Sequence, residues 1–200
     1  MTKRLVLASH NAKKTAELAS ILQPLGLELL SLADFPDVVA PEEDGDTFDE
    51  NASIKAVSAF HVTGLPSLAD DSGLVVPALG GLPGVRSARF AGENAGDEEN
   101  KAALLDKMTN MEGDDRRAYF VSVVALAISE KSILTFRGET EGTILRQPIG
   151  YSGFGYDPLF LSSDLGVTFA EADAAEKNRV SHRGRALSKL CNYLTINPLY

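Results

Sequence analysis

The stretch SLADDSGLVVPALGGLPGVRSARFAG, residues 67–92, decides how this chain folds, because it sets two adjacent carboxylates inside an apolar run. Its first part reads as a buried strand, where charges are costly unless they are paired or used. Side chains alternate across a strand, so Asp70 and Asp71 are predicted to point to opposite faces. Only one of them can readily face a given cleft, and the other is predicted to be a structural aspartate with backbone or lysine partners.

A glycine-rich turn comes next, at residues 80–84, and Arg86 and Arg89 follow it. Glycine and proline there predict a sharp turn whose backbone can approach a ligand closely. Acids, the Ser72 hydroxyl, a glycine loop and two arginines in one short segment suggest a metal-and-phosphate site rather than packing alone.

Composition narrows the class of protein. Two hundred residues with 44% hydrophobic content predict an ordered chain that forms one domain, 1–200, or two lobes that share a sheet. The net charge of −9 disfavours a nucleic-acid polymer as partner. Clusters of lysine and arginine within an acidic chain suit a small anionic ligand better.

The cysteine count and the first residues of the chain indicate the cellular compartment of the protein. Cys191 is the single cysteine, so no intrachain disulfide forms and nothing indicates an oxidising compartment. CxxC and HExxH motifs are absent, which removes the usual zinc sites. The apolar run at the beginning is too short for a signal peptide or a membrane span, so we expect a cytoplasmic protein without a membrane partner.

Strands and helices are predicted in mixed order, which indicates an α/β fold with a mixed sheet. The predicted strands are 3–9, 27–32, the segment around Asp70, a hairpin of 119–128 and 133–137, and a further strand 139–145. The predicted helices follow Asn11, run from Thr47 through Phe60, cover 97–109, and close the chain from Ser181 through Leu194.

The first loop predicts an anion site. Asn11 can cap the following helix, and that alone would explain its presence. Lys13 and Lys14 then oppose the helix dipole, at about 0.3–1 kcal/mol each, and a bound phosphate would reverse that penalty. Thr47 and Glu50 have capping-box spacing, and Lys55 shares a helix face with Asn51. The acidic run 42–46 is by default solvated.

Two later segments have a functional and a structural interpretation. Phe154 or Tyr156, in a glycine and aromatic loop, can stack on a planar base, or both can be core aromatics at a turn. His182 and Arg183 are predicted in the first turn of the last helix, with Lys177 nearby. They can read an anion or a carbonyl, although a lone histidine is more often structural.

Six segments together resemble the inosine/xanthosine triphosphate pyrophosphatase family, in the family's order and over nearly the whole chain. They are SHNAKK (9–14), FDENASIKA (48–56), ADDSGL (69–74), GGLPGVRSARFAG (80–92), GFGYDPLF (153–160) and KNRVSHR (177–183). The resemblance implies Mg²⁺-dependent hydrolysis of dITP, ITP and XTP to the monophosphate and pyrophosphate, which clears them from the nucleotide pool. It also implies an elongated mixed sheet flanked by helices, two lobes with a central cleft, and usually a homodimer.

The resemblance also assigns roles to residues. Asp71 would be the catalytic proton acceptor and, with Glu42, a metal ligand. The triphosphate loop would comprise Ser9, His10, Asn11, Ala12, Lys13 and Lys14. The other substrate contacts would be Lys55, Ser72, Phe154, Gly155, Tyr156, Asp157, Lys177, His182 and Arg183. Relatives often have glycine at positions 10 and 13 and an aromatic residue at position 86, so contacts there are expected to differ.

These residue types fit the chemistry. Magnesium and lysines would neutralise the polyphosphate, while Asp71 positions or deprotonates a water that attacks the α-phosphorus. Arg183 or a backbone N–H would donate to O6 of the base, which adenine lacks. This interpretation requires Glu42 to lie near Asp71, and both to lie on the same side of the sheet as Lys14 and Arg183.

Two alternatives stay open from the residues alone. A Maf-like pyrophosphatase for modified pyrimidines is disfavoured by the SHR and GFGYD segments. A non-catalytic nucleotide-binding module is disfavoured because pure anion binding gains nothing from Asp71 and Glu42.

Overall fold

The computed structural model describes residues 3–9, 11–35 and 41–199. The chain divides into two compact units. The first unit comprises residues 1–71, 122–138 and 183–200, and the second comprises residues 72–121 and 139–182. The single domain of two lobes with a central cleft stays a prediction.

A six-stranded sheet has the strand order β2-β1-β3-β4-β5-β6. Strand β1 pairs in parallel with β2 and β3, whereas β5 and β6 are antiparallel, so the predicted mixed sheet is confirmed. The strands are β1 (Arg4–Leu7), β2 (Glu28–Ser31), β3 (Ser67–Val75), β4 (Arg117–Ser129), β5 (Ser132–Ile144) and β6 (Phe160–Ser162).

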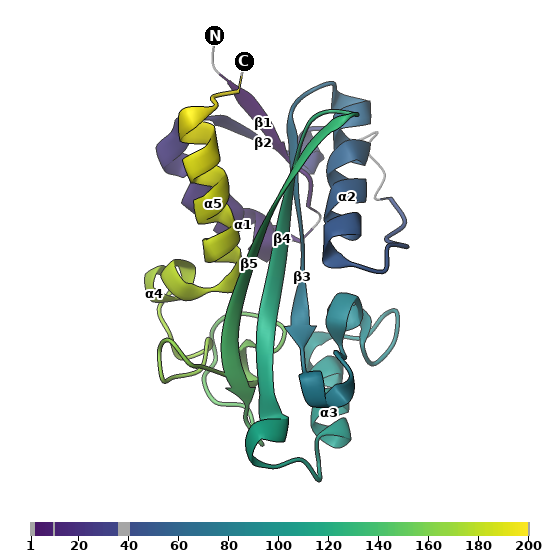
Figure 1. Ribbon diagram of the computed structural model, residues 1–200, viewed down its shortest axis with the longest axis vertical. Helices are drawn as coiled ribbons and strands as arrows, with labels where there is room; N and C mark the ends of the chain where they lie inside the picture. Colours follow the sequence, from purple (N-terminus) through teal and green to yellow (C-terminus); the bar gives the residue numbers. More distant parts are fainter. Residues whose placement is uncertain (1–2, 10, 36–40, 200) are drawn as a thin grey trace. The chain divides into compact units, whose positions relative to one another are not determined.

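The first unit has a core of leucines between its sheet and two helices. Helices α1 (Ala12–Leu22) and α5 (His182–Ile196) pack on leucines of β1 and β3 and on Val124 and Leu126 of β4. Helix α2 (Phe48–Thr63) lies on the opposite face of this part of the sheet (Figure 1). Each face of β3 in the first unit is therefore covered by helices.

The second unit has its own core, rich in aromatic residues. Phe120 of β4 packs on Phe160 and Phe169, with ring centroids 4.6 and 6.0 Å away. Helices α3 (Asp97–Lys107) and α4 (Ala174–Val180) belong to this unit. Short 3₁₀ segments lie at Gln23–Leu25, Leu32–Asp34, Pro77–Leu79, Gly84–Arg89, Gly113–Arg116 and Asp157–Leu159. In the described ranges, no helix is long and apolar enough to cross a membrane.

The sequence prediction was wrong at one boundary and incomplete at two elements. The segments 133–137 and 139–145 form one strand, β5 (Ser132–Ile144), which runs through Gly138 without a positive φ there. Strand β6 has three residues and α4 has seven, and elements this short give little periodic signal.

The predicted capping box at α2 is present. Thr47 Oγ1 accepts from Glu50 N at 3.2 Å, and Glu50 Oε2 accepts from Thr47 N at 3.0 Å. These two bonds satisfy amide groups that have no partner within the helix.

We predict that Thr47→Ala lowers the free energy of unfolding by about 1 kcal/mol, because Glu50 N loses its acceptor. Thr47→Ser keeps the hydroxyl and is the matched control, with a stability close to that of the original chain. Urea unfolding followed by circular dichroism measures both. Equal losses in the two variants would contradict a capping role.

Candidate active site

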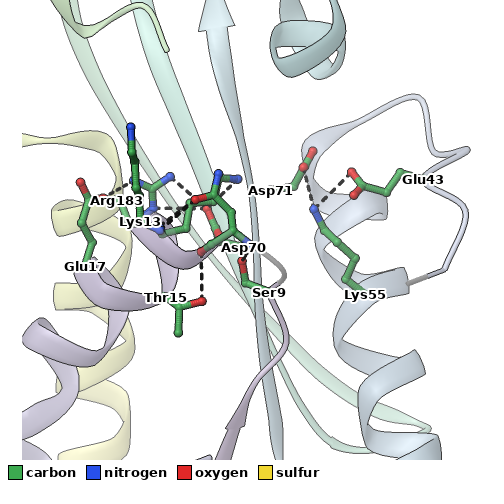
Figure 2. A network of polar contacts seen from close by, with 11 residues as sticks. Ser9, Lys13, Thr15, Glu17, Glu43, Lys55, Asp70, Asp71 and Arg183 are labelled. Atoms are coloured by element: carbon green, nitrogen blue, oxygen red, sulfur yellow. Dashed lines mark hydrogen bonds and ion pairs between the residues drawn. The ribbon is translucent and has the colours of Figure 1, made fainter. Parts of the chain in front are cut away.

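Asp70 and Asp71 lie on opposite sides of β3, as their alternation predicts. Asp70 meets Lys14 of α1 and Arg183 of α5, and Asp71 meets Lys55 of α2 (Figure 2). Strand β1 ends at Leu7, which is in register with Leu68, so both aspartates lie beyond the end of β1. The loop that leads into α1 begins at this end of the strand.

Asp70 belongs to a buried ionic network. Its Oδ2 accepts from Arg183 Nε and Nη2 at 3.3 and 3.2 Å, and Lys14 Nζ lies 3.4 Å away. Arg183 also donates to Glu17 through Nη1. Burial alone would raise the pKa of Asp70, but the charges of Lys14 and Arg183 outweigh it and lower the pKa. The predicted structural role of Asp70 fits this network, with an arginine in addition to a lysine.

Asp71 is paired with one cation, whereas Asp70 is paired with two. Lys55 Nζ donates to its Oδ1 at 2.8 Å and to Glu43 Oε2 at 3.3 Å. Asp71 is 6% exposed, and among the described residues no hydrogen-bond partner reaches its Oδ2. Burial raises the pKa of the Asp71 carboxyl, and the charge of Lys55 only partly opposes this rise.

The loop before α1, which is predicted to bind a phosphate, caps its own helix. Asn11 Oδ1 accepts from the backbone N–H groups of Lys13 and Lys14 at 3.0 and 3.2 Å, and Ser9 Oγ accepts from Asn11 N at 3.2 Å. The capping interpretation of Asn11 is confirmed. Ala12 is exposed at the first position of α1, and His10 lies outside the described residues.

The arrangement differs from the expectation that Asp71, Lys14 and Arg183 share one side of the sheet. Lys14 and Arg183 both pair with Asp70. Figure 2 shows Asp70 and Arg183 on the side of β3 opposite to the Asp71–Lys55 pair. Arg183 is 2% exposed and its N–H groups are directed to Asp70 and Glu17. Its geometry therefore supports a role in holding the site together rather than in reading a base.

The acids that the resemblance assigned to a metal are only partly assembled. Glu42 is exposed, while its neighbour Glu43 shares Lys55 with Asp71. Across 3–9, 11–35 and 41–199, no group of three or more histidine, cysteine or acidic side chains is placed to hold a metal ion. However, Asp70 Oδ1 and Asp71 Oδ2 are buried carboxylate oxygens without hydrogen-bond partners there. Such oxygens fit the ligand preference of Mg²⁺.

The second unit contains the other predicted substrate contacts. Asp157 Oδ2 accepts from Lys177 Nζ at 2.7 Å and from Phe154 N at 2.9 Å. Lys177 Nζ lies 5.0 Å from the centroid of the half-buried Phe154 ring. Tyr156 is buried, and its hydroxyl donates to Ser87 O at 2.9 Å. Phe154 is thus half-buried, whereas Tyr156 is the core aromatic of the alternative interpretation.

The remaining predicted residues of this unit are largely built into its structure. His182, the first residue of α5, is buried and stacks on Phe120 with centroids 4.7 Å apart. Ser72 is half-buried in β3. Arg86 and Arg89 form ion pairs with Glu93 at 3.2 and 3.8 Å, so their charges are partly balanced within the chain.

Sequence reasoning missed Glu17 and Glu43. Glu17 follows Lys14 by one helical turn, which places the two on one face of α1, but nothing local indicates Arg183 as its partner. Glu43 is one of several acids in a run, and only the fold distinguishes it from Glu42.

Comparison with known proteins gives matches over nearly the whole chain. The sequence profile of the Ham1 family matches residues 5–193. A dITP/XTP pyrophosphatase from Geobacter sulfurreducens is 53% identical over 191 residues, 96% of this chain and 96% of that protein. One of the same name from Aromatoleum aromaticum is 51% identical over 201 residues, 100% of both chains. The structure of a HAM1 protein from Coxiella burnetii has a TM-score of 0.90 and 45% identity, covering 97% of this chain and 99% of that one.

We predict that Asp70→Asn lowers the free energy of unfolding by about 3–5 kcal/mol, because Lys14 and Arg183 lose a buried counter-charge. The control is Asp49→Asn, which breaks the exposed ion pair with Arg137 and costs at most about 1 kcal/mol. Urea unfolding gives both values. A loss for Asp70→Asn no larger than that of the control would show that the network does not support the fold.

Proposed function

Because the chain belongs to the Ham1 family, we propose that it is a nucleoside-triphosphate pyrophosphatase that hydrolyses dITP, ITP and XTP. The products are the nucleoside monophosphate and pyrophosphate, and the reaction clears these nucleotides from the pool. Relatives named dITP/XTP pyrophosphatase, about half identical to this chain over nearly its full length, support the substrate class.

One observation in the site carries the proposal. Asp71 is a buried carboxylate with one oxygen on Lys55 and the other without a hydrogen-bond partner among the described residues. Asp70 Oδ1 lacks a partner as well, but the charges of Lys14 and Arg183 lower the pKa of Asp70. Burial instead raises the pKa of Asp71, which makes this carboxylate a better proton acceptor than an exposed one.

We propose that Asp71 orients the attacking water and accepts its proton. The water oxygen bonds to the α-phosphorus as the bond from that phosphorus to the bridging oxygen breaks, and pyrophosphate leaves. Lys55, and Lys13 in the first turn of α1, would attract the polyphosphate, whereas Lys14 is paired with Asp70 on the other side of β3. Glu42 and Asp71 are the residues that would hold Mg²⁺, and the ion would neutralise part of the substrate's charge.

The purine would be selected through its O6 oxygen. Arg183 is occupied by Asp70 and Glu17, so a backbone N–H is now the better candidate for the donor to O6. Adenine presents an amino group at that position, and two facing donors would leave both unpaired, at about 1–3 kcal/mol each. The half-buried ring of Phe154 would stack on the base.

The resemblance extends the proposal to location and assembly. We propose a cytoplasmic enzyme, because its substrates would be free nucleotides and the single cysteine gives no sign of an oxidising compartment. We also propose a homodimer.

We predict that the purified chain releases pyrophosphate from dITP, ITP and XTP at least about a hundredfold faster than from ATP, GTP or modified pyrimidine triphosphates. Chelation of Mg²⁺ with EDTA should abolish the activity, and added Mg²⁺ should restore it. Ion chromatography distinguishes pyrophosphate from phosphate. Preference for a modified pyrimidine would support a Maf-like activity, and nucleotide binding without turnover would support a binding module.

We predict that Asp71→Asn lowers kcat by at least about a hundredfold, because the amide cannot accept the proton. Calorimetric titration with ITP should show that binding largely survives. Asp46→Asn removes an exposed acid from the run that includes Glu42, and it should leave kcat unchanged. A kcat near the original value in Asp71→Asn would remove Asp71 from the mechanism.

A further inference from the structure

The loop 153–157, which carries Phe154, is fixed by a carboxylate from outside its own segment. Asp97, the first residue of α3, accepts from Gly155 N through Oδ2 at 2.8 Å. The two residues are 58 positions apart in the sequence and belong to the same unit. The proposed function gives Asp97 no role.

The loop is tightly constrained around this contact. Its own Asp157 accepts from Phe154 N, and a Cβ at Gly153 would lie 2.2 Å from Asp157 Oδ2, so glycine is required there. Gly155 has a φ of +59°, a backbone conformation that glycine adopts more readily than other residues. The next residue, Tyr156, donates from its hydroxyl to Ser87 O. Asp97 thus completes the restraint on both sides of Phe154.

Two features of the beginning of α3 favour the placement of Asp97. As the first residue of α3, it lies in the helix turn where the dipole favours a carboxylate. Gly96, just before it, is tied to Glu99 Oε2 at 2.7 Å through its N–H. The acceptor for Gly155 is therefore an exposed carboxylate on the first residue of a helix.

We propose that Asp97 is a positioning residue for substrate binding: it holds Gly155 and thereby fixes the ring of Phe154 for the purine. This inference rests on the proposed function, since it takes the base to be a purine that stacks on Phe154. Asp97 does not itself touch the substrate or the reacting atoms. Its loss weakens binding of the base and leaves the hydrolytic step intact.

The experiment compares Asp97→Ala, Asp97→Asn and Glu98→Gln. Asp97→Ala removes the acceptor, and we expect the KM for dITP to rise about tenfold with kcat unchanged. Asp97→Asn keeps an oxygen that can accept from Gly155 N, so its KM should return to within about twofold of the original value. Glu98→Gln removes a charge from the same turn while it keeps an acceptor for Lys101, and it should leave KM unchanged.

Amide hydrogen exchange at Gly155, followed by NMR, gives a readout that does not need activity. It should become faster in Asp97→Ala and remain slow in the other two variants. A KM rise of equal size in Glu98→Gln, or no rescue by Asp97→Asn, would assign the effect to helix charge and overturn the proposal. An unchanged KM in Asp97→Ala would overturn it as well.

The same measurements separate this inference from the proposed function. If the original chain does not hydrolyse dITP or XTP, the proposed function fails. The role in purine binding then fails with it, and exchange at Gly155 still tests whether Asp97 holds the loop: unchanged exchange in Asp97→Ala shows that it does not, and faster exchange shows that it does.

Discussion

The burial of two neighbouring carboxylates in one strand is the constraint on which the first unit depends. Asp70 and Asp71 are 3% and 6% exposed, and the alternation of β3 directs them to opposite faces. Each face must therefore bring its own cation, because an unpaired buried charge is costly. Helices α1 and α5 supply Lys14 and Arg183 on one face, and α2 supplies Lys55 on the other. The three helices are tied to the same two residues of the sheet.

The same residue type acquires two different properties in these two places. Two cations lower the pKa of Asp70, whereas burial raises the pKa of Asp71, whose principal cation Lys55 is shared with Glu43. Asp70 is therefore suited to a permanent charge within the fold, and Asp71 to proton transfer. The sequence DD does not distinguish the two, but the number of cations on each face does.

Features set by neighbouring residues were predictable from the sequence, and long-range partners were not. The caps at Asn11 and Thr47 and the alternation of the aspartates depend on a few consecutive residues, and each prediction was confirmed. Arg183 and Asp70 are 113 positions apart, and no local pattern selects one buried carboxylate over another. Asp97 looked like an ordinary first-turn acid for the same reason. The family resemblance proposes the site residues, but it could not show which of them pair with each other in the fold.

Lys14 shows how a partner that is distant in the sequence changes the interpretation of a local pattern. Lys14 near the beginning of α1 and Arg183 near the beginning of α5 both oppose a helix dipole, and such cations need a nearby anion. From sequence alone, a bound phosphate was the natural partner for Lys14. In the fold, Asp70 forms ion pairs with both cations, and Glu17 is a second carboxylate that pairs with Arg183. Lys14 and Arg183 are thus balanced by carboxylates of the chain, and a polyphosphate at this end of β1 is supported by the Asp71–Lys55 pair and by the family, not by Lys14.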